Sequence, residues 1–453
     1  MDDTSKQFDL TTGGILQKLL VIAAPVIGMQ LFQMIYNLAD MFWMGKLGTD
    51  ALAATASSGM YLWLSMGLLV LGRMGAEIGV SQAFGAGDTE AAHRYMTNSF
   101  LLSVVFGTVV GLAMTIFRGP LVGFFNIREA EVVSLSELYL GISGIGVPMM
   151  YVAAVVSGAF TGAGNSRLVF YINAIGIVFN LVLDPIMIFA LDMGIIGAAL
   201  SNVLGQLLGL VLSLIALYRH KSRPFAKAAL WKKPSWDVMK QIWIWGLPVV
   251  LESLLFPFLS MLNTRMLTQW GAEALAAQRI ASQAESLSWL IAGGFCMAVT
   301  SFIGQNYGAG KWTRIHRGMR ISAGMLAVYG VLITAALFFL GEPIFRVFTD
   351  DEVVIAIGVR FLQILAACQF VACFEPLCAG CFRGIGRTTP PSVISITCNA
   401  LRVPLAFFLS RTGLGVYGIM WGIVFGAIAR AALLMLVYAI QSRKLPKTDR
   451  VVV

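Results

Sequence analysis

Two aspartates lie inside long apolar stretches of the chain. Asp40 occurs in IYNLADMFW and Asp184 in FNLVLDPIMIF, and neither has a basic residue within one helical turn. A charged side chain at the centre of a membrane-spanning helix costs roughly 2.5–3.5 kcal/mol on insertion scales, so it is functional by default. A carboxyl group buried without a cation binds a proton more readily than one in water. Such a group can load a proton on one side of a membrane and release it on the other.

Polar residues accompany both aspartates. Tyr36 and Asn37 lie about one helical turn before the first aspartate, and Asn180 lies one turn before Asp184 on the same helical face. Pro185 follows Asp184 directly, frees a backbone carbonyl and permits a bend. A purely structural alternative stays open, in which the first aspartate caps a broken helix and the second bonds a hydroxyl group for packing alone.

The composition of the chain indicates where these aspartates lie. Of 453 residues, 58% are hydrophobic and 12% are charged, whereas an ordinary soluble domain has about 25% charged residues. The apolar residues form blocks close to the roughly 20 residues that a helix needs to cross a bilayer. We therefore predict an all-α polytopic membrane protein with twelve transmembrane helices. The expected helices are 15–43, 52–82, 94–117, 132–159, 168–191, 195–218, 238–267, 275–305, 315–340, 353–382, 390–411 and 416–441.

The distribution of basic residues predicts the orientation of these helices. Lys and Arg gather after even-numbered helices, as in 219–233 and the C-terminal tail, whereas 342–352 carries four acids. Because basic residues concentrate on the cytoplasmic side, we expect both termini in the cytoplasm. The N-terminus lacks the basic stretch of a secretory signal, so we expect no cleavage. Topology thus explains the net charge of +9, and no nucleic-acid partner is expected.

An internal repeat organises the chain. Pro25 and Pro248 differ by 223 positions in the sequence. The same shift relates Gly48 to Gly271, Gln82 to Gln305, and Gly85-Ala86-Gly87 to Gly308-Ala309-Gly310. Each half has an even number of helices, so the halves are expected to be parallel repeats related by a pseudo-two-fold axis along the membrane normal. The expected lobes are 1–218 and 238–453, joined by a cytoplasmic basic linker at 219–237.

With these motifs in order, the sequence resembles the multidrug and toxic compound extrusion (MATE) family over nearly its whole length. The segments that carry the resemblance are YNLAD at 36–40, LGTDALAA at 47–54, QAFGAG at 82–87, LDP at 183–185, GLP at 246–248 and QNYGAG at 305–310. Within the family it looks most like the prokaryotic branch related to DNA-damage-inducible protein F, which has a carboxylate in its first helix and another in its fifth.

This resemblance implies a location in the prokaryotic plasma (inner) membrane and a cation site in the first lobe. The site residues would be Tyr36, Asn37, Asp40, Asn180, Asp184 and Asn202. In relatives, the place of Asn202 holds a short polar residue. Such a site can hold a proton or coordinate sodium through oxygen ligands.

The second half does not keep these acids. The first aspartate maps onto Asn263, and the second maps onto the apolar stretch VPLAFFL. The secondary acidic candidates of this half are Glu252, Glu285 and Glu375. Sodium-coupled relatives use second-lobe carboxylates in their seventh and tenth helices, but the spacing differs here. Arg279 and Arg402 are candidates to neutralise these acids.

Methionine and aromatic residues of the first helices of each lobe predict a substrate cavity. The expected lining residues are Met34, Met41, Trp43, Met60, Trp63, Met66, Phe256, Met261 and Trp289. Adaptable methionine surfaces suit varied lipophilic ligands. Contact with lipid, packing between helices and interfacial tryptophan belts are the alternative explanation of the same residues.

Together these features predict a secondary active efflux antiporter that exports lipophilic or cationic small molecules by alternating access. Protons are the expected coupling ion, with sodium second, and no cofactor or bound metal is expected. The rival is a flippase for a lipid-linked oligosaccharide, which would be expected to have a basic cavity for pyrophosphate. We expect no enzyme activity, because the sequence has no metal-ligand cluster, nucleophile motif or phosphate loop. The expected partners of a monomer are its small-molecule substrates and the lipid bilayer.

Overall fold

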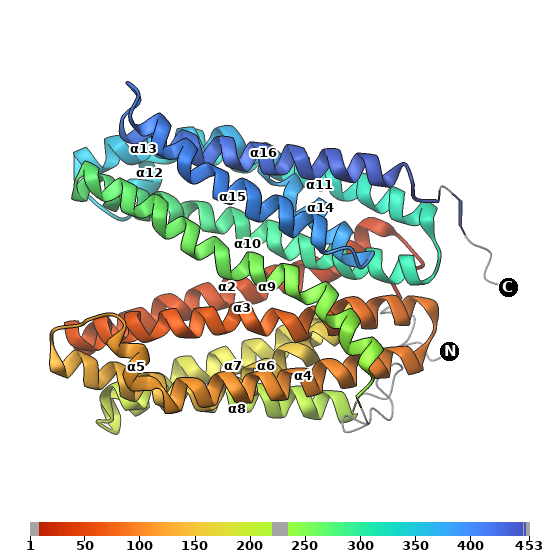
Figure 1. Ribbon diagram of the computed structural model, residues 1–453, viewed down its shortest axis with the longest axis horizontal. Helices are drawn as coiled ribbons and strands as arrows, with labels where there is room; N and C mark the ends of the chain where they lie inside the picture. Colours follow the sequence, from red (N-terminus) through yellow and green to blue (C-terminus); the bar gives the residue numbers. More distant parts are fainter. Residues whose placement is uncertain (1–8, 220–233, 447, 450–453) are drawn as a thin grey trace. The chain divides into compact units, whose positions relative to one another are not determined.

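The structure, a computed structural model, describes residues 9–219, 234–446 and 448–449. Within these residues all regular structure is helical (Figure 1), and 12 helices are long and apolar enough to span a membrane. The predicted number of spans is confirmed, and their ends differ from the predicted ranges by a few residues. Most of the predicted linker lies outside the described residues.

Helices of very different length make up the first half of the chain. They are α2 (Ile15–Leu47), α3 (Thr49–Ala86), α4 (Thr89–Ile116), α5 (Arg118–Gly123), α6 (Ala130–Gly162), α7 (Ser166–Pro185), the π-helical turn η1 (Ile186–Ala190) and α8 (Gly194–Arg219). The short α5 lies at one end of its helical bundle, between the long helices α4 and α6 in sequence (Figure 1).

The second half repeats this pattern with one additional break. Its elements are α9 (Trp236–Leu267), the 3-10 turn η2 (Thr268–Trp270), α10 (Ala272–Gly308), α11 (Trp312–Phe339), α12 (Gly341–Arg346), α13 (Glu352–Ala372), α14 (Phe374–Gly384), α15 (Thr389–Ser410) and α16 (Val416–Ser442). The span predicted over 353–382 is present as Glu352–Gly384, but its helix is interrupted at Cys373. Pro376 has no amide hydrogen to donate to the carbonyl of Ala372, and the regular hydrogen-bond ladder ends there.

Glycines with positive φ occur at matching positions in the two halves. The pairs are Gly48 (φ 123°) with Gly271 (97°), Gly87 (73°) with Gly310 (68°), Gly164 (92°) with Gly386 (75°), and Gly194 (54°) with Gly415 (53°). Residues with a side chain rarely adopt these conformations, whereas glycine does so without steric cost. Both halves therefore end and begin their helices with the same backbone turns, and the repeat in the sequence is also present in the backbone.

Contacts divide the chain into two units at a place that the sequence did not indicate. Unit 1 contains Leu20–Val250 and unit 2 contains Leu251–Val453, together with Gly13–Leu19 from the start of α2. The division falls inside α9, whereas the sequence placed it in the linker before that helix. The first part of α9 packs on unit 1, where Trp245 stacks on Tyr95 with ring centroids 5.4 Å apart.

In unit 1, the backbones of α4 and α6 approach closely. A Cβ atom on Gly111 of α4 would lie 2.4 Å from the carbonyl oxygen of Gly144 on α6. Apolar attraction is weak between helices in lipid, so small residues that permit close van der Waals packing stabilise the pair. The central helix α6 also packs on α3 and α8. It thereby holds the helices that carry the polar residues of this unit.

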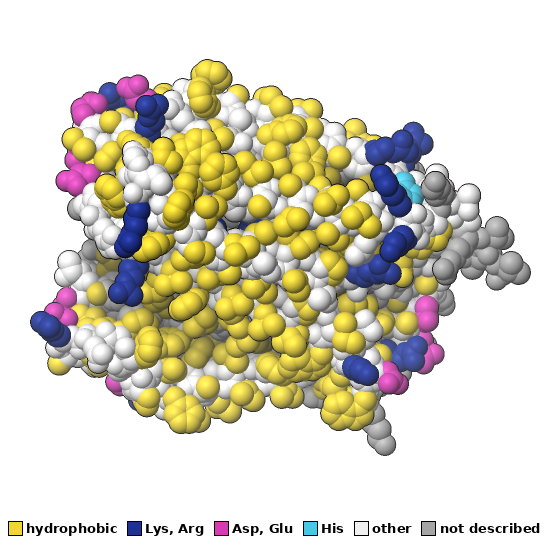
Figure 2. Space-filling model, turned by 45° about the horizontal axis from the view of Figure 1, so that its top comes forward, with side chains coloured by type: hydrophobic (Ala, Val, Ile, Leu, Met, Phe, Trp, Pro, Cys, Tyr) yellow, Lys and Arg dark blue, Asp and Glu magenta, His cyan; other side chains and the backbone are white. Residues whose placement is uncertain are grey.

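The opposite side of α4 is apolar and exposed. Val105, Val109, Leu112 and Ile116 follow a helical spacing, and each is more than half exposed. An amphipathic helix of a soluble protein would place charged residues on such a face. On the face drawn in Figure 2, hydrophobic side chains cover the middle and charged side chains gather toward the ends of the helices. The chain is a multi-pass membrane protein.

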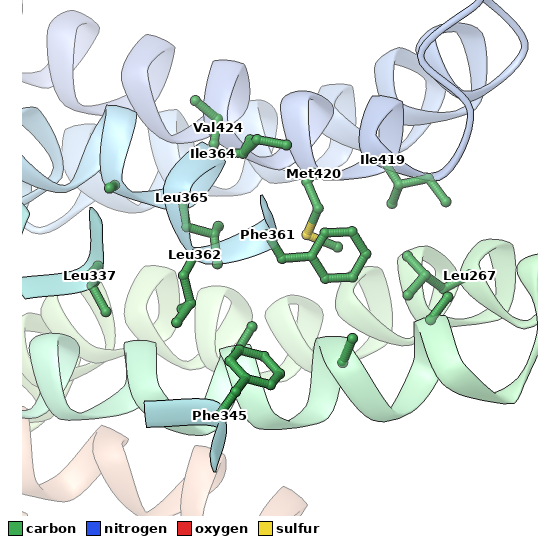
Figure 3. Packing of buried hydrophobic residues seen from close by; sticks show 14 of the residues in the cluster. Leu267, Leu337, Phe345, Phe361, Leu362, Ile364, Leu365, Ile419, Met420 and Val424 are labelled. Atoms are coloured by element: carbon green, nitrogen blue, oxygen red, sulfur yellow. The ribbon is translucent and has the colours of Figure 1, made fainter. Parts of the chain in front are cut away.

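The main apolar cluster of unit 2 is built around α13. Phe361 and Leu362 are fully buried, and Phe361 points toward Met420 of α16 (Figure 3). Phe345 of α12 fills the space beside Gly358, where a Cβ atom would lie 2.0 Å from its ring. The short helix α12 is thereby fixed to α13.

The contact between α4 and α6 gives a test of this packing. Gly111→Ala should destabilise the protein by about 1–3 kcal/mol, because the added methyl group overlaps the Gly144 carbonyl. The apparent Tm of the detergent-solubilised protein should fall. Gly59→Ala is the matched control, since no atom lies within 4 Å of a Cβ atom there. Equal Tm values for the two variants would contradict the close approach of α4 and α6.

Candidate functional site

Asp184 lies where α7 loses its regular geometry. Pro185 ends α7, and the following residues form the π-helical turn η1, in which the amide of Leu191 donates to the carbonyl of Ile186 at 2.9 Å. Proline removes one hydrogen bond of an α-helix and clashes with the preceding turn, and single π turns frequently occur at functional sites. The irregularity that Pro185 predicted is therefore a local widening of the helix directly after the aspartate.

Three polar side chains from three helices of unit 1 form a hydrogen-bonded cluster. The Tyr36 hydroxyl of α2 donates to Oδ1 of Asn202 on α8. Nδ2 of Asn180, on α7, lies 3.2 Å from the same oxygen and 3.3 Å from the Tyr36 hydroxyl oxygen. Gly205 makes room for this contact, because a Cβ atom there would lie 2.6 Å from Oδ1 of Asn180. The predicted residues Tyr36, Asn180 and Asn202 thus lie together.

Asp184 is fully buried beside this cluster and contacts Ser201 of α8. The Ser201 hydroxyl also lies 2.9 Å from the carbonyl oxygen of Ala198. A hydroxyl group has one hydrogen to donate. If Asp184 is ionised, Ser201 can satisfy only one of these two acceptors. If Asp184 is protonated, it can donate to Ser201 while Ser201 donates to Ala198, so the protonated acid satisfies both contacts.

Asp40 completes a pair of acids that has no basic partner. It is partly buried one helical turn after Tyr36, and its Oδ1 atom is buried without a hydrogen-bond partner among the described residues. Asp184 lies within electrostatic range of it. No Lys or Arg of the described residues lies within the 4.0 Å ion-pair distance of either carboxyl group. The two acids therefore require a cation or a proton from outside the protein.

Oxygen atoms near the two acids could serve as ligands for such a cation. Oδ2 of Asp184 and Oδ1 of Asn180 are both buried without a hydrogen-bond partner among the described residues. Carboxylate and amide oxygens are ligands that hard cations prefer. In the part of the chain that the structure describes, no cluster of three or more His, Cys, Asp or Glu residues could hold a metal ion. The arrangement can accept a proton or a weakly bound alkali cation.

The structure separates one predicted site residue from this cluster and adds two. Asn37 is exposed, and its Oδ1 accepts from Gln33 on the same helix at 3.2 Å. Tyr139 of α6 is buried within electrostatic range of both aspartates and within reach of Asn202. Ser201 is the second addition. Its place directly before Asn202 was a usable signal in the sequence, whereas nothing in the apolar stretch around Tyr139 marked that residue.

The predicted cavity residues belong to both units, and each is described within its own unit. Six of them have large exposed surfaces: Met41, Met60, Trp63 and Met66 in unit 1, and Phe256 and Met261 in unit 2. Met34 and Trp289 are half-buried. Trp43 instead packs edge-to-face on Phe42 and Phe189, with ring centroids 5.1 Å and 5.9 Å away. Trp43 therefore contributes to the packing of α2 against η1.

In unit 2, each of the three predicted glutamates has a hydrogen-bond or ion-pair partner. Glu252 accepts from the hydroxyl of Ser392 at 2.9 Å. Glu285 accepts from Nε1 of Trp289 and from Nε2 of Gln369, both at 3.1 Å. Glu375, on α14, pairs with Arg430. Polar groups of α10, α13 and α15 thereby satisfy Glu252 and Glu285, which the sequence left without assigned partners.

The neutralising arginine is not one of the two that the sequence indicated. Arg430 of α16 lies 2.7 Å from Glu375, and its Nη1 donates to Oδ1 of Asn399 at 3.2 Å. Arg279 is exposed, and Arg402 lies within ion-pair distance of no carboxylate among the described residues. The pair of Arg430 and Glu375 joins helices that are far apart in sequence, so local spacing carries no information about it.

The fold and the site define a duplicated, twelve-span membrane protein with a buried acidic site in its first half. Comparison with known proteins agrees with this description. The MatE family model matches residues 25–186 and again residues 248–408, so the second match begins 223 residues after the first. The chain belongs to the MatE family.

Relatives and solved structures match the chain over nearly its full length. The chain is 28% identical to the probable multidrug resistance protein NorM of Thermotoga maritima, over 94% of this chain and 92% of that protein. It is 22% identical to the multidrug export protein MepA of Staphylococcus aureus, over 97% of each. A crystal structure of MATE in complex with MaD3S has the same fold, with a TM-score of 0.91 and 23% identity over 98% of this chain and 99% of that one.

The cluster around Tyr36 gives a test that does not depend on transport. Tyr36→Phe removes the hydroxyl group that contacts Asn202 and Asn180, and it should cost about 1 kcal/mol of stability. Tyr171→Phe is the control, because Tyr171 is 61% exposed on α7. Thermal unfolding in detergent should show a lower Tm for the first variant alone. A Tm for Tyr36→Phe equal to that of the control would exclude a structural role for this hydroxyl group.

Proposed function

We propose that this protein is a secondary active multidrug efflux antiporter that exports lipophilic or cationic small molecules in exchange for protons. The relatives NorM, a probable multidrug resistance protein, and MepA, a multidrug export protein, support the substrate class. The observation that carries the coupling is the pair of acids, Asp40 and Asp184, without a basic partner among the described residues. Sodium is the second candidate for the coupling ion.

The contact between Asp184 and Ser201 supports protons as the coupling ion. A proton on Asp184 changes which hydrogen bonds connect α7 to α8, since Ser201 can then donate to Ala198. Loss of the proton turns the Ser201 hydroxyl to Asp184, while the Ala198 carbonyl still accepts from Nδ2 of Asn202 at 3.1 Å. It also adds a charge in a medium of low dielectric constant, which is costly. The ionised site is therefore less stable in this arrangement and favours another. Protonation of Asp184 would thus select between conformations in an alternating-access cycle.

The remaining features of the proposal follow from the sequence. The distribution of Lys and Arg supports cytoplasmic termini, and the resemblance to a prokaryotic branch supports the inner membrane. We expect a monomer without enzyme activity. A flippase for a lipid-linked oligosaccharide is the alternative, and it would be expected to hold pyrophosphate with basic groups. The acidic cluster of unit 1 does not favour it.

Gradient-driven transport tests the proposal directly. The protein is reconstituted in liposomes, proton and sodium gradients are imposed separately, and movement of a fluorescent cationic dye is measured. The proton gradient alone should drive efflux, because Asp184 is fully buried without a basic partner among the described residues and loses its charge when it takes up a proton. Asp184→Asn and Asp40→Asn should each lower the proton-driven rate at least about tenfold, since a single proton-transferring group contributes about 10²–10⁴-fold to rates in enzymes.

Asp192→Asn is the matched control for these variants. Asp192 lies shortly after the same span, is exposed and has φ 53°, a conformation that asparagine tolerates. This variant should transport like the unmodified protein. Dye efflux driven by the sodium gradient alone would identify sodium, and not the proton, as the coupling ion. If neither gradient drives efflux, or if Asp184→Asn transports normally, the antiporter mechanism is wrong.

A further inference from the structure

Arg402 lies on the buried face of α15 in unit 2. Ser395, Asn399 and Ala406 share this face, at helical spacing from it, and all are buried. Gly426 of α16 packs directly against the arginine, since a Cβ atom there would lie 2.8 Å from Cβ of Arg402. The side chain of Arg402 therefore begins inside a close-packed contact between α15 and α16. Only 9% of the residue is exposed.

The contacts of Arg402 use little of its hydrogen-bonding capacity. Nη2 donates to the hydroxyl of Ser260 on α9 at 2.7 Å, and the guanidinium carbon lies 5.4 Å from the ring centroid of Phe256. Its Nε atom is buried without a hydrogen-bond partner among the described residues. A guanidinium group carries five N–H donors. The printed contact with Ser260 uses one of these donors, and the buried Nε–H has no acceptor among the described residues.

Arg430, in the same unit, is a buried arginine that has both an anionic and an amide partner. It has a carboxylate at 2.7 Å and an amide oxygen at 3.2 Å. Arg402 has neither. Glu285 lies within its electrostatic range, but the Oε1 atom of that glutamate already accepts from Trp289 and Gln369. Glu252, Glu285 and Glu375 thus each have other partners, and no carboxylate of the described residues lies within the 4.0 Å ion-pair distance of Arg402.

A buried charge without a partner is expensive inside a membrane and persists where function requires it. We infer that Arg402 binds the anionic group of a transported organic acid or zwitterion, a carboxylate above all. The planar guanidinium fork matches the two oxygens of a carboxylate. Phe256, which is 42% exposed beside it, offers an apolar surface to the body of such a molecule. This inference rests on the proposed transport function and extends its substrates to lipophilic molecules that carry an anionic group.

The repeat relates the region of Arg402, which is basic, to the region of Asp184, which is acidic. Asn180 lies five positions before Pro185, and Asn399 lies five positions before Pro404. In the register of the flanking glycine pairs, Gly164 with Gly386 and Gly194 with Gly415, Asp184 corresponds to Leu405 or Ala406. Arg402 therefore lies about one helical turn before the place where the first half carries its acid. The second half has therefore replaced an acid that takes up a cation with a base that takes up an anion.

Direct binding to the purified protein tests the inference without requiring transport. Rhodamine B has a free carboxylate and its methyl ester does not, so the two dyes differ in that group alone. Their affinities are measured by fluorescence anisotropy in phosphatidylcholine nanodiscs. Rhodamine B should bind the unmodified protein about tenfold more tightly than the ester, as expected for one charge-assisted bidentate contact. Equal affinities would overturn the inference, and this comparison needs no variant.

Variants then assign the preference to one side chain. Arg402→Gln should reduce the affinity for rhodamine B about tenfold and leave that for the ester unchanged. Arg402→Lys keeps the charge and should retain part of the preference. Arg411→Gln is the control, because Arg411 ends the same helix, is exposed and stacks on Phe407. Equal weakening of both dyes by Arg402→Gln would mean a structural role and would overturn the inference.

An anionic lipid headgroup could offer the same chemistry. The binding measurements are therefore repeated in nanodiscs that contain phosphatidylglycerol. An unchanged affinity for rhodamine B supports a transported acid, whereas a loss that Arg402→Gln abolishes would assign the site to lipid and overturn the substrate assignment. If no gradient drives dye efflux but the protein still prefers rhodamine B to its methyl ester, the antiporter proposal is wrong and the binding site at Arg402 stands.

Discussion

A charge inside a bilayer has to be compensated, and this constraint shapes the interior of both halves of the protein. In unit 1, Asp184 and Asp40 have no basic partner among the described residues, and a proton on Asp184 removes its charge while Ser201 donates to Ala198. In unit 2, Glu375 is compensated permanently by Arg430. A removable compensating charge allows a site to work in cycles, whereas a permanent one stabilises a single arrangement.

The two halves share a scaffold without sharing this chemistry. Paired glycines with positive φ, such as Gly87 and Gly310, keep the helix ends alike. Those turns depend on backbone conformation and not on the side chains inside each bundle. After duplication, the interior residues could therefore diverge while the helices kept their lengths and order. The asparagine and proline that flank Asp184 in one half and Arg402 in the other are what remains of the common origin.

The sequence predicted what depends on local spacing and missed what depends on packing. The twelve spans follow from apolar length, and the neighbourhood of Asn180 and Asp184 follows from one helical turn. Ser201 was missed because its role depends on how α8 packs against α7. Arg430 was missed because it lies 55 positions from its partner Glu375 in the sequence. Such distant pairs are fixed by the arrangement of whole helices, to which a single sequence gives no direct access.

The division of α9 between the two units has a mechanical consequence. The change from one unit to the other between Val250 and Leu251 falls inside a continuous helix and not in a loop. A regular helix resists bending through its ladder of backbone hydrogen bonds, but Pro248 cannot donate to the carbonyl of Ile244. The helix is thus weakened two residues before the division at Val250. A helix that two units share therefore has its weakest hydrogen bonding close to the residue where its contacts pass from one unit to the other.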